Sequence, residues 1–346
     1  MVRADASPAI GTGHVMRSLA LAQSWCGSRD PGTAVKRAAF LMSSTTAAID
    51  ERLRTVGMTL ARLEAPLGTR AEVEETIRFA REAGAGWVVL DGYHFLPDMQ
   101  GALRAAGLRV LCIDDNGDAA DYQADVILNH NFHARAELYP HRSATTRLLL
   151  GPGYALLRPE FTAAWPTRRT PPVARKLLVT LGGADPANAT QMVLAALQEL
   201  PIEGLEVVVV VGGSNLRQKE LEQLAAGIGA HIRVVHDAPN MAELMAWADL
   251  AVATASVTTL ELACMGLPAL LMVLAENQRL IAEYLHEQGL ARYLGWHHEL
   301  NPVRLREAIF ALAGDPKTRD NMSARGRSLV DGRGAGRVAA ELSKAA

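Results

Sequence analysis

Aromatic residues and cysteines are scarce in this chain of 346 residues, and neither sign of charge is in clear excess. Aromatic residues make up 5% of the chain and alanine is very abundant, which fits a helix-rich α/β enzyme better than an all-β sandwich. The 35 Lys and Arg residues nearly balance the 37 Asp and Glu residues, so charge gives no reason to expect a nucleic acid or an acidic membrane as the main partner. At 49% hydrophobic residues the chain can build two cores, which excludes a disordered protein.

The three cysteines, Cys26, Cys112 and Cys264, lie far apart and form no CxxC pair. We therefore expect free thiols in a reducing compartment. The N-terminal residues show no basic segment followed by an apolar run, so no secretory signal is predicted. The longest apolar stretches, such as 205–211, are too short to span a bilayer. These features predict a cytoplasmic protein.

Short apolar runs alternate with longer amphipathic stretches along the whole chain. Runs of β-forming residues without alternation indicate strands covered on both faces, hence parallel sheets. Amphipathic segments such as 72–83 and 188–200 have helical spacing. The repeated strand–helix–strand units predict an α/β fold with two doubly wound, Rossmann-like domains. The predicted strands are 1–4, 38–42, 87–90, 108–113, 126–128 and 148–150, then 177–181, 205–211, 232–235, 250–253 and 269–274.

A segment rich in proline and charge, 165–172, is the predicted linker between the domains. The prediction is a first domain over 1–165, a second over 173–320, and terminal helices over 321–346, the last of which has the length to return to the first domain. Two such domains should enclose a cleft, where ligands bind beyond the carboxyl ends of the strands. The predicted assembly is a monomer or a weak homo-oligomer.

The first candidate motif occupies 3–17 and has the form of a ligand-facing turn between a strand and a helix. Gly11 and Gly13 allow close approach of a ligand to the backbone. His14 falls at the first turn of the helix, where the helix dipole favours a neutral ring that accepts a proton. The alternative is a histidine that only caps the helix. The motif is not a dinucleotide fingerprint, because Met16 stands where that motif needs glycine or alanine.

Two turns in the second half have the same strand–turn–helix form. Gly182 and Gly183 follow its first predicted strand, as an anion-facing turn would require. A second buried strand ends in hydroxyl residues that can bond phosphate, and an acid that can bond a ribose follows them: Ser256, Thr258, Thr259 and Glu261. The alternative is a Ser/Thr cap with a favourable acid early in the helix.

Polar residues also follow other predicted strands. They comprise the turn 91–94, the pair Asp114 and Asp115, and the amides Asn277 and Gln278. The alternative for the acids is that they cap helices or form turns. The His130 and His133 pair has the spacing of metal ligands, but a loop rich in Asn and His predicts polar surface. The chain has no P-loop, no HExxH and no nucleophile elbow, and we expect neither a metal nor a cofactor.

The motif at 3–17 closely resembles the N-terminal signature of the UDP-2,4-diacetamido-2,4,6-trideoxy-β-L-altropyranose hydrolases of pseudaminic acid biosynthesis, which related spore-coat polysaccharide proteins share. The resemblance covers most of the chain in order. It continues through 91–93, 113–115, 150–159, 182–185, 266–268 and 277–278. The opening motif is highly specific, whereas the motifs of the second domain are shared with many GT-B glycosyltransferases.

The resemblance implies a GT-B fold whose second domain holds UDP. The implied reaction is metal-free hydrolysis at the anomeric carbon, with inversion and C–O cleavage, giving UDP and the free diacetamido sugar. Its catalytic histidine corresponds to His14 and its active-site tyrosine to Tyr93. The residues expected at the sugar are Asp5, Gly13, Arg17, Asp115, Asn277 and Gln278; those expected at UDP are Gly182, Gly183, Ser256, Thr258, Thr259 and Glu261.

One departure from the family lies in the run 254–259. Many relatives have a glycine- and serine-rich segment there, whereas Ala255 and Val257 remove flexibility and a hydroxyl from the expected diphosphate contact. Two other functions share the second-domain motifs. A GT-B glycosyltransferase would move the sugar from UDP to an acceptor, and a silent binding protein would hold the UDP-sugar without turnover.

Overall fold

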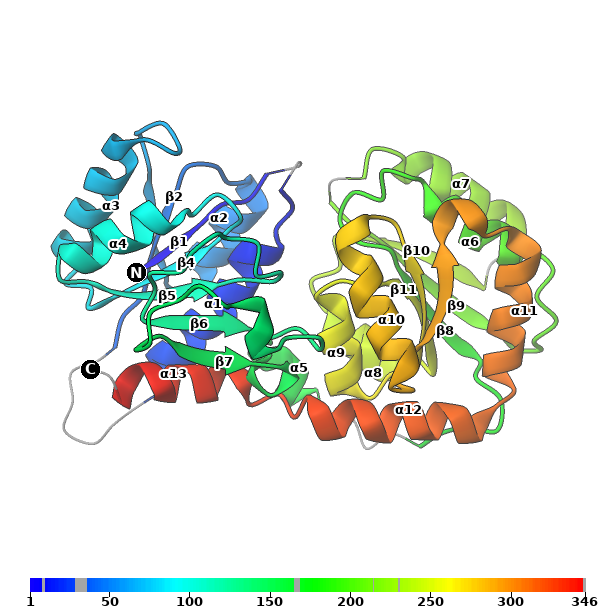
Figure 1. Ribbon diagram of the computed structural model, residues 1–346. Coiled ribbons are helices and arrows are strands. Elements are labelled where there is room, and N and C mark those ends of the chain that lie inside the picture. The colour runs from blue at the N-terminus through cyan, green and yellow to red at the C-terminus, as the bar shows by residue number, and fades with distance from the viewer. Residues whose placement is uncertain (8–9, 29–35, 165–168, 214, 230, 345–346) are drawn as a thin grey trace. The chain divides into compact units, whose positions relative to one another are not determined.

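The chain divides into two compact units, Met1–Arg158 with Gly332–Ala346, and Pro159–Asp331 (Figure 1). The predicted boundaries were 165, 173 and 320, and the structure divides the chain at Arg158 and Asp331 instead. Residues 165–168 of the predicted linker lie outside the described residues. The computed structural model describes residues 1–7, 10–28, 36–164, 169–213, 215–229 and 231–344.

The first unit is built on a seven-stranded parallel sheet in the order β3-β2-β1-β4-β5-β6-β7. Val2 in β1 lies opposite Phe40 in β2 and Val89 in β4. Its strands are β1 (Val2–Ala4), β2 (Ala39–Met42), β3 (Thr59–Arg62), β4 (Trp87–Asp91), β5 (Arg109–Ile113), β6 (Val126–Asn129) and β7 (Arg147–Leu150). Its helices are α1 (Gly13–Gly27), α2 (Ala47–Thr55), α3 (Arg70–Glu82), α4 (Pro97–Ala105) and α13 (Gly334–Lys344), with short 3-10 turns η1 (Ala136–Leu138) and η2 (Pro152–Tyr154).

Apolar side chains cover both faces of this sheet. One core joins strand residues such as Phe40 to α1, α2 and α13, and the other joins Leu90 to α3 and α4. Thr46 and Thr69 cap α2 and α3 by accepting backbone N–H bonds, which explains where these helices begin. The terminal helix α13 therefore belongs to the core of the first unit.

The second unit has a six-stranded parallel sheet in the order β10-β9-β8-β11-β12-β13. Its strands are β8 (Lys176–Thr180), β9 (Glu206–Val211), β10 (Ile232–His236), β11 (Leu250–Thr254), β12 (Ala269–Val273) and β13 (Arg292–Trp296). Its helices are α5 (Pro159–Ala163), α6 (Ala189–Leu197), α7 (Gln218–Ile228), α8 (Met241–Trp247), α9 (Thr258–Met265), α10 (Arg279–Glu287), α11 (Pro302–Ala313) and α12 (Pro316–Leu329), with η3 (Glu276–Gln278) and η4 (His297–Glu299). Gly326 lets α12 approach α9, because a Cβ there would lie 2.9 Å from the Ala263 carbonyl oxygen.

The predicted fold class, with two parallel, doubly wound sheets, is confirmed. In each sheet the strand order reverses beside the first strand, between β1 and β4 and between β8 and β11. Such a reversal opens a crevice at the carboxyl ends of the strands, where α/β folds bind ligands. A ligand site is therefore expected at these two places.

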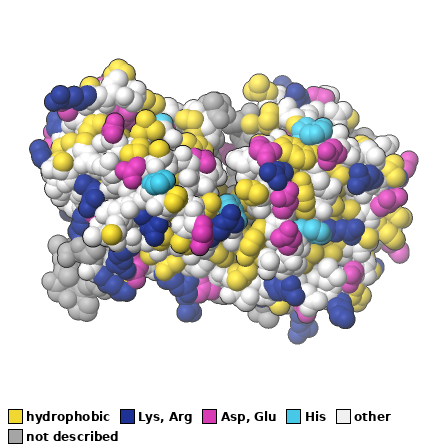
Figure 2. All heavy atoms as spheres, in the orientation of Figure 1, with side chains coloured by type: hydrophobic (Ala, Val, Ile, Leu, Met, Phe, Trp, Pro, Cys, Tyr) yellow, Lys and Arg dark blue, Asp and Glu magenta, His cyan; other side chains and the backbone are white. Residues whose placement is uncertain are grey.

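Charges of both signs are interspersed over the face of the molecule in Figure 2, as the balanced composition predicts. Within the described residues, no helix combines the length and the apolar character that crossing a membrane requires.

Candidate active site

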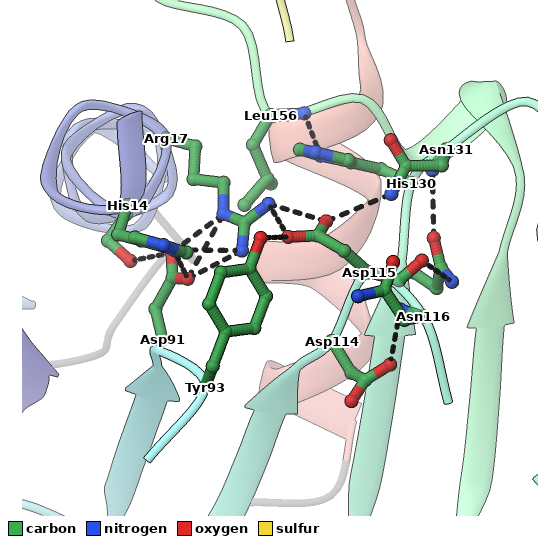
Figure 3. Close-up of polar contacts among 12 residues, drawn as sticks. His14, Arg17, Asp91, Tyr93, Asp114, Asp115, Asn116, His130, Asn131 and Leu156 are labelled. Atoms are coloured by element: carbon green, nitrogen blue, oxygen red, sulfur yellow. Dashed lines mark hydrogen bonds and ion pairs between the residues drawn. The ribbon is translucent and has the colours of Figure 1, made fainter. Parts of the chain in front are cut away.

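A histidine and an aspartate meet at the strand reversal of the first unit. His14 lies in the first turn of α1, which follows β1, and Asp91 is the last residue of the neighbouring strand β4. Because β1 and β4 pair directly, the two side chains meet although 77 residues separate them. His14 Nδ1 lies 2.8 Å from Asp91 Oδ1, and the Asp91 side chain is fully buried. Figure 3 shows this pair with the residues around it.

The charge of Asp91 decides the tautomer of His14. Burial alone would raise the pKa of Asp91, but the charge of Arg17 and the hydrogen bonds from His14 and Arg17 bring it below its ordinary value. An ionised carboxylate only accepts hydrogen bonds, so in the neutral form of His14 the hydrogen lies on Nδ1 and the lone pair on Nε2. No described residue forms a hydrogen bond with Nε2, which leaves it able to accept a proton.

Arg17 joins this pair to a second carboxylate. Its Nε and Nη2 atoms donate to Asp91, at 2.9 Å to Oδ2 and 2.6 Å to Oδ1, while Nη1 donates to Asp115 at 2.7 and 3.0 Å. Ser18 donates a further bond of 2.9 Å to Asp91 Oδ2. The Arg17 charge and its hydrogen bonds outweigh the effect of burial on Asp115 and bring its pKa well below the ordinary value. Both acids are therefore ionised at neutral pH.

Tyr93 lies over the same cluster. Its hydroxyl donates to Asp115 Oδ2 at 3.1 Å, and its ring meets the His14 ring edge-on at 5.0 Å. Desolvation of the hydroxyl, which faces Asp115, and the Asp115 charge raise the pKa of Tyr93 although most of the ring is exposed, so the phenol stays protonated as a donor. Tyr93 is 65% exposed, whereas His14, Arg17 and Asp91 are buried.

The segment that follows β6 corrects one prediction. The loop with His130 was predicted to be polar surface, but Asn129, His130 and Asn131 are buried. The reason is that β6 pairs with β5, so its end lies beside Asp115, which accepts a bond of 2.9 Å from Asn131 Nδ2. Burial and the Arg17 charge lower the pKa of His130 to about 4, so this ring is neutral at pH 7.

Two further predicted residues have structural contacts. Asp5 is buried, pairs with Arg3 at 2.8 Å and accepts the Ser43 N–H at 2.6 Å. Asp114 accepts bonds from the hydroxyls of Tyr122 and Tyr139, at 2.8 and 3.1 Å. These contacts fix the loops that carry the site. No cluster of three or more His, Cys, Asp and Glu side chains suited to a metal ion occurs among the described residues.

In the second unit, the turn after β8 is closed by its own aspartate. Gly182 has a φ of 92°, and Asp185 caps α6 by accepting the N–H groups of Ala189 and Thr190 at 2.8 and 2.9 Å. The helix N–H groups of this predicted anion-facing turn are therefore occupied. Gly183 packs tightly against Gly212, where an added Cβ would lie 2.3 Å from the Gly183 Cα.

The N-terminus of α9 has a different arrangement. The N-cap residue Val257 makes no side-chain cap, and the N–H groups of Thr259 and Leu260 bond to the carbonyl oxygens of Ser256 and Val257 at 2.8 and 3.0 Å. Thr259 donates its hydroxyl to the Ser256 carbonyl at 2.7 Å, and Thr258 and Glu261 lie in the first turn. This end of α9 is the feature of the second unit best suited to an anion.

The predicted amides lie in η3, directly after β12. Gln278 Oε1 accepts the Leu274 N–H at 2.9 Å, whereas Asn277 is exposed. Of the predicted residues, the structure connects His14, Arg17, Tyr93 and Asp115 directly (Figure 3), and Gly13 begins the helix that carries His14.

The sequence analysis did not place in the site Asp91, which contacts His14, Asn131, which contacts Asp115, or Ser18, which contacts Asp91. Asp91 had a signal, since an acid directly ends the buried apolar run 87–90. Asn131 and Ser18 had none.

Comparison with known proteins shows what the chain is similar to. Residues 177–332, most of the second unit, match the glycosyltransferase family 28 C-terminal domain. The spore coat polysaccharide biosynthesis protein SpsG of Bacillus subtilis (strain 168) is 30% identical over 234 residues, 67% of this chain and 68% of that protein. The UDP-2,4-diacetamido-2,4,6-trideoxy-beta-L-altropyranose hydrolase of Campylobacter jejuni is 24% identical over 294 residues, 84% of this chain and 96% of that protein.

Among solved structures, Anabaena HepE in complex with UDP-glucose superposes with a TM-score of 0.65 at 15% identity, covering 100% of this chain and 99% of that one. This likeness, with the two parallel sheets, identifies the fold as GT-B.

Proposed function

The chain belongs to the family of the spore coat polysaccharide biosynthesis protein SpsG, and we propose that it hydrolyses a UDP-linked 2,4-diacetamido-2,4,6-trideoxyhexose of the altrose type to UDP and the free sugar. The name of the Campylobacter jejuni relative states this substrate and reaction for that protein, which aligns over nearly its whole length. The product would serve pseudaminic acid biosynthesis or a related surface glycan.

The observation that carries the proposal is the His14–Asp91 pair. A buried carboxylate at 2.8 Å holds the ring in one tautomer and stabilises the imidazolium that forms when Nε2 takes a proton. A histidine held in this way is suited to act as the general base for a water molecule, typically worth about 10²–10⁴-fold in rate. His14 and Tyr93 are the proposed catalytic residues.

The proposed step is a single displacement. The water oxygen forms a bond to the anomeric carbon while the bond from that carbon to the diphosphate oxygen breaks, and its electron pair leaves with UDP. The water proton moves to His14 Nε2 and later passes to solvent. Attack from the face opposite to UDP inverts the anomeric configuration.

The second unit is proposed to hold UDP. The N-terminus of α9 has no side-chain cap and presents the positive end of a helix dipole, which stabilises charge as it develops on the leaving diphosphate. Ser256, Thr258 and Thr259 surround this end, and Glu261 is proposed to bond the ribose. We assign Gly182 and Gly183 to close approach of the backbone, because Asp185 already occupies the N–H groups of α6.

The test is incubation of the protein with the altrose-configured UDP-sugar in ¹⁸O-labelled water, without any acceptor. We expect UDP and free sugar, with the label in the sugar. Label in UDP would mean attack at phosphorus, and no release of UDP without an acceptor would contradict hydrolysis. The same incubation with His14→Gln measures the background.

A glycosyltransferase is the second candidate, and the family 28 match favours it. The same base would then deprotonate an acceptor hydroxyl instead of water. Release of UDP that depends on an added acceptor, with the sugar found on that acceptor, would identify this activity.

A further inference from the structure

Arg17 is the most completely engaged side chain of the site. It is 3% exposed, and each of its three guanidinium nitrogens has a carboxylate oxygen within 2.9 Å. A guanidinium has five N–H donors and no acceptor, and here the donors face Asp91 and Asp115. The side chain therefore has little to offer a substrate, although the sequence placed it among the sugar-binding residues.

We propose that Arg17 is a positioning residue, which locks Asp91 and Asp115 into one ionic unit behind His14, orients the ring, and sets a positive charge against the attraction of Asp91 for a ring proton. Only the predicted effect of Arg17 on the reaction rate rests on the proposed function. Its structural consequence, the protonation of His14, is measurable in the absence of any substrate.

The geometry of the charges supports this role. His14 Nδ1 lies 2.8 Å from Asp91 Oδ1 and 3.2 Å from Arg17 Nη2. Since Nδ1 carries its hydrogen, the Arg17 contact is not a hydrogen bond but the approach of a positive charge to the ring. The Arg17 charge therefore opposes the attraction of Asp91 for a proton on His14.

The other titratable groups near His14 supply no positive charge that could take the place of Arg17. Tyr93 is a neutral phenol, and Asp115 adds a second negative charge. On the loop after β4, burial and the Arg3 charge lower the pKa of His94, so His94 adds no positive charge at neutral pH. Arg17 is thus the positive charge in direct contact with the His14–Asp91 pair among the described residues.

The shape of the side chain supports the orienting half of the role. The planar fork donates to Asp91 through Nε and Nη2 and to Asp115 through Nη1, which fixes both acids relative to α1. Lysine carries the same charge but cannot make these paired bonds. Arg17→Lys therefore separates geometry from charge, and Arg17→Gln removes both.

The experiment is a pH titration of the His14 ring by NMR in the full-length protein labelled at histidine, with His14→Gln used to assign the signals. We expect Arg17→Gln to raise the pH at which His14 takes up its proton by at least one unit, about tenfold in proton affinity. Arg17→Lys should titrate as the wild type does. Two controls should also titrate as the wild type does: Ser18→Ala, which removes a neutral bond to Asp91, and Arg104→Gln, which removes a charge from α4.

Kinetics supply the second readout. We expect both Arg17 variants to lower kcat with KM for the UDP-sugar within about threefold of the wild type, and the acidic limb of the rate profile to move to higher pH in Arg17→Gln alone. An unchanged titration in Arg17→Gln, or a raised KM with an unchanged kcat, would overturn the proposal and return Arg17 to the sugar site.

The proposal stays testable even if Arg17→Gln does not fold. If Arg17→Gln does not fold, Asp115→Asn gives the opposite perturbation, because it removes a negative charge and leaves Arg17 in place. His14 should then take up its proton at a lower pH than in the wild type, and an unchanged or higher value would refute the charge balance. If the wild type releases no UDP, the proposed function fails, while the titrations still decide the role of Arg17.

Discussion

Replacing Asp91 by asparagine should disable the proposed base while leaving UDP binding intact. An amide in place of the carboxylate removes the negative charge at 2.8 Å from the ring and can donate to Nδ1, which would move the ring hydrogen to Nε2. An ion pair at about 4 Å is worth about 4 kcal/mol at an effective dielectric constant near 20. That energy corresponds to a loss of roughly 10³-fold in kcat.

The assay is release of UDP from the UDP-sugar without an acceptor, together with UDP affinity by calorimetry. Ser18→Ala is the matched control, because it removes a bond of 2.9 Å to the same carboxylate without a change of charge, and it should cost at most about tenfold. Thermal unfolding curves of both variants identify a temperature at which both are folded, and their rates are compared at that temperature. If Asp91→Asn keeps kcat within about threefold of the wild type, the assignment of Asp91 as the partner of the base is refuted.

Three further predictions follow from contacts in the two units. Tyr93→Phe removes the bond of 3.1 Å to Asp115 and should lower kcat/KM by about 5- to 10-fold, measured by UDP release; a full rate would make Tyr93 a bystander. Asp185→Ala uncaps α6 and should lower the free energy of unfolding by about 1–2 kcal/mol in denaturant titrations, with UDP affinity nearly unchanged, and a large loss of affinity would contradict the placement of the diphosphate at α9. The folded-state pKa of Asp115 lies below its ordinary value near 4, so the ionised carboxylate stabilises the folded protein fully above that pH, and this contribution is lost as the pH falls. Asp115→Asn should therefore lower the free energy of unfolding more at pH 7 than at pH 3. An equal effect at the two pH values would contradict the ion pair.

Most of the fold could be predicted from the sequence, because buried parallel strands appear as unbroken apolar runs. The two strands that the sequence analysis missed, β3 and β13, both lie at sheet edges. Each is half exposed and mixes polar with apolar residues, so neither has an apolar run. A strand that buries only part of its surface carries a weaker signal.

The site was predictable in its parts but not in its connections. His14 and Tyr93 stand out beside glycines and at a strand end, but the partner of His14 lies 77 residues away. That pairing depends on β4 lying next to β1, which no local pattern specifies. For the same reason the burial of Asn131 beside Asp115 was missed, since it follows from the pairing of β6 with β5.

The central claim is that His14 takes the proton of the attacking water, and a single-turnover experiment tests it most directly. Enzyme in excess is mixed with the UDP-sugar, and formation of free sugar is followed for the wild type and for His14→Gln, with UDP affinity measured for both. We predict equal UDP affinity and a loss of about 10²–10⁴-fold in the rate of the His14→Gln turnover. An unchanged rate with equal affinity would contradict the account.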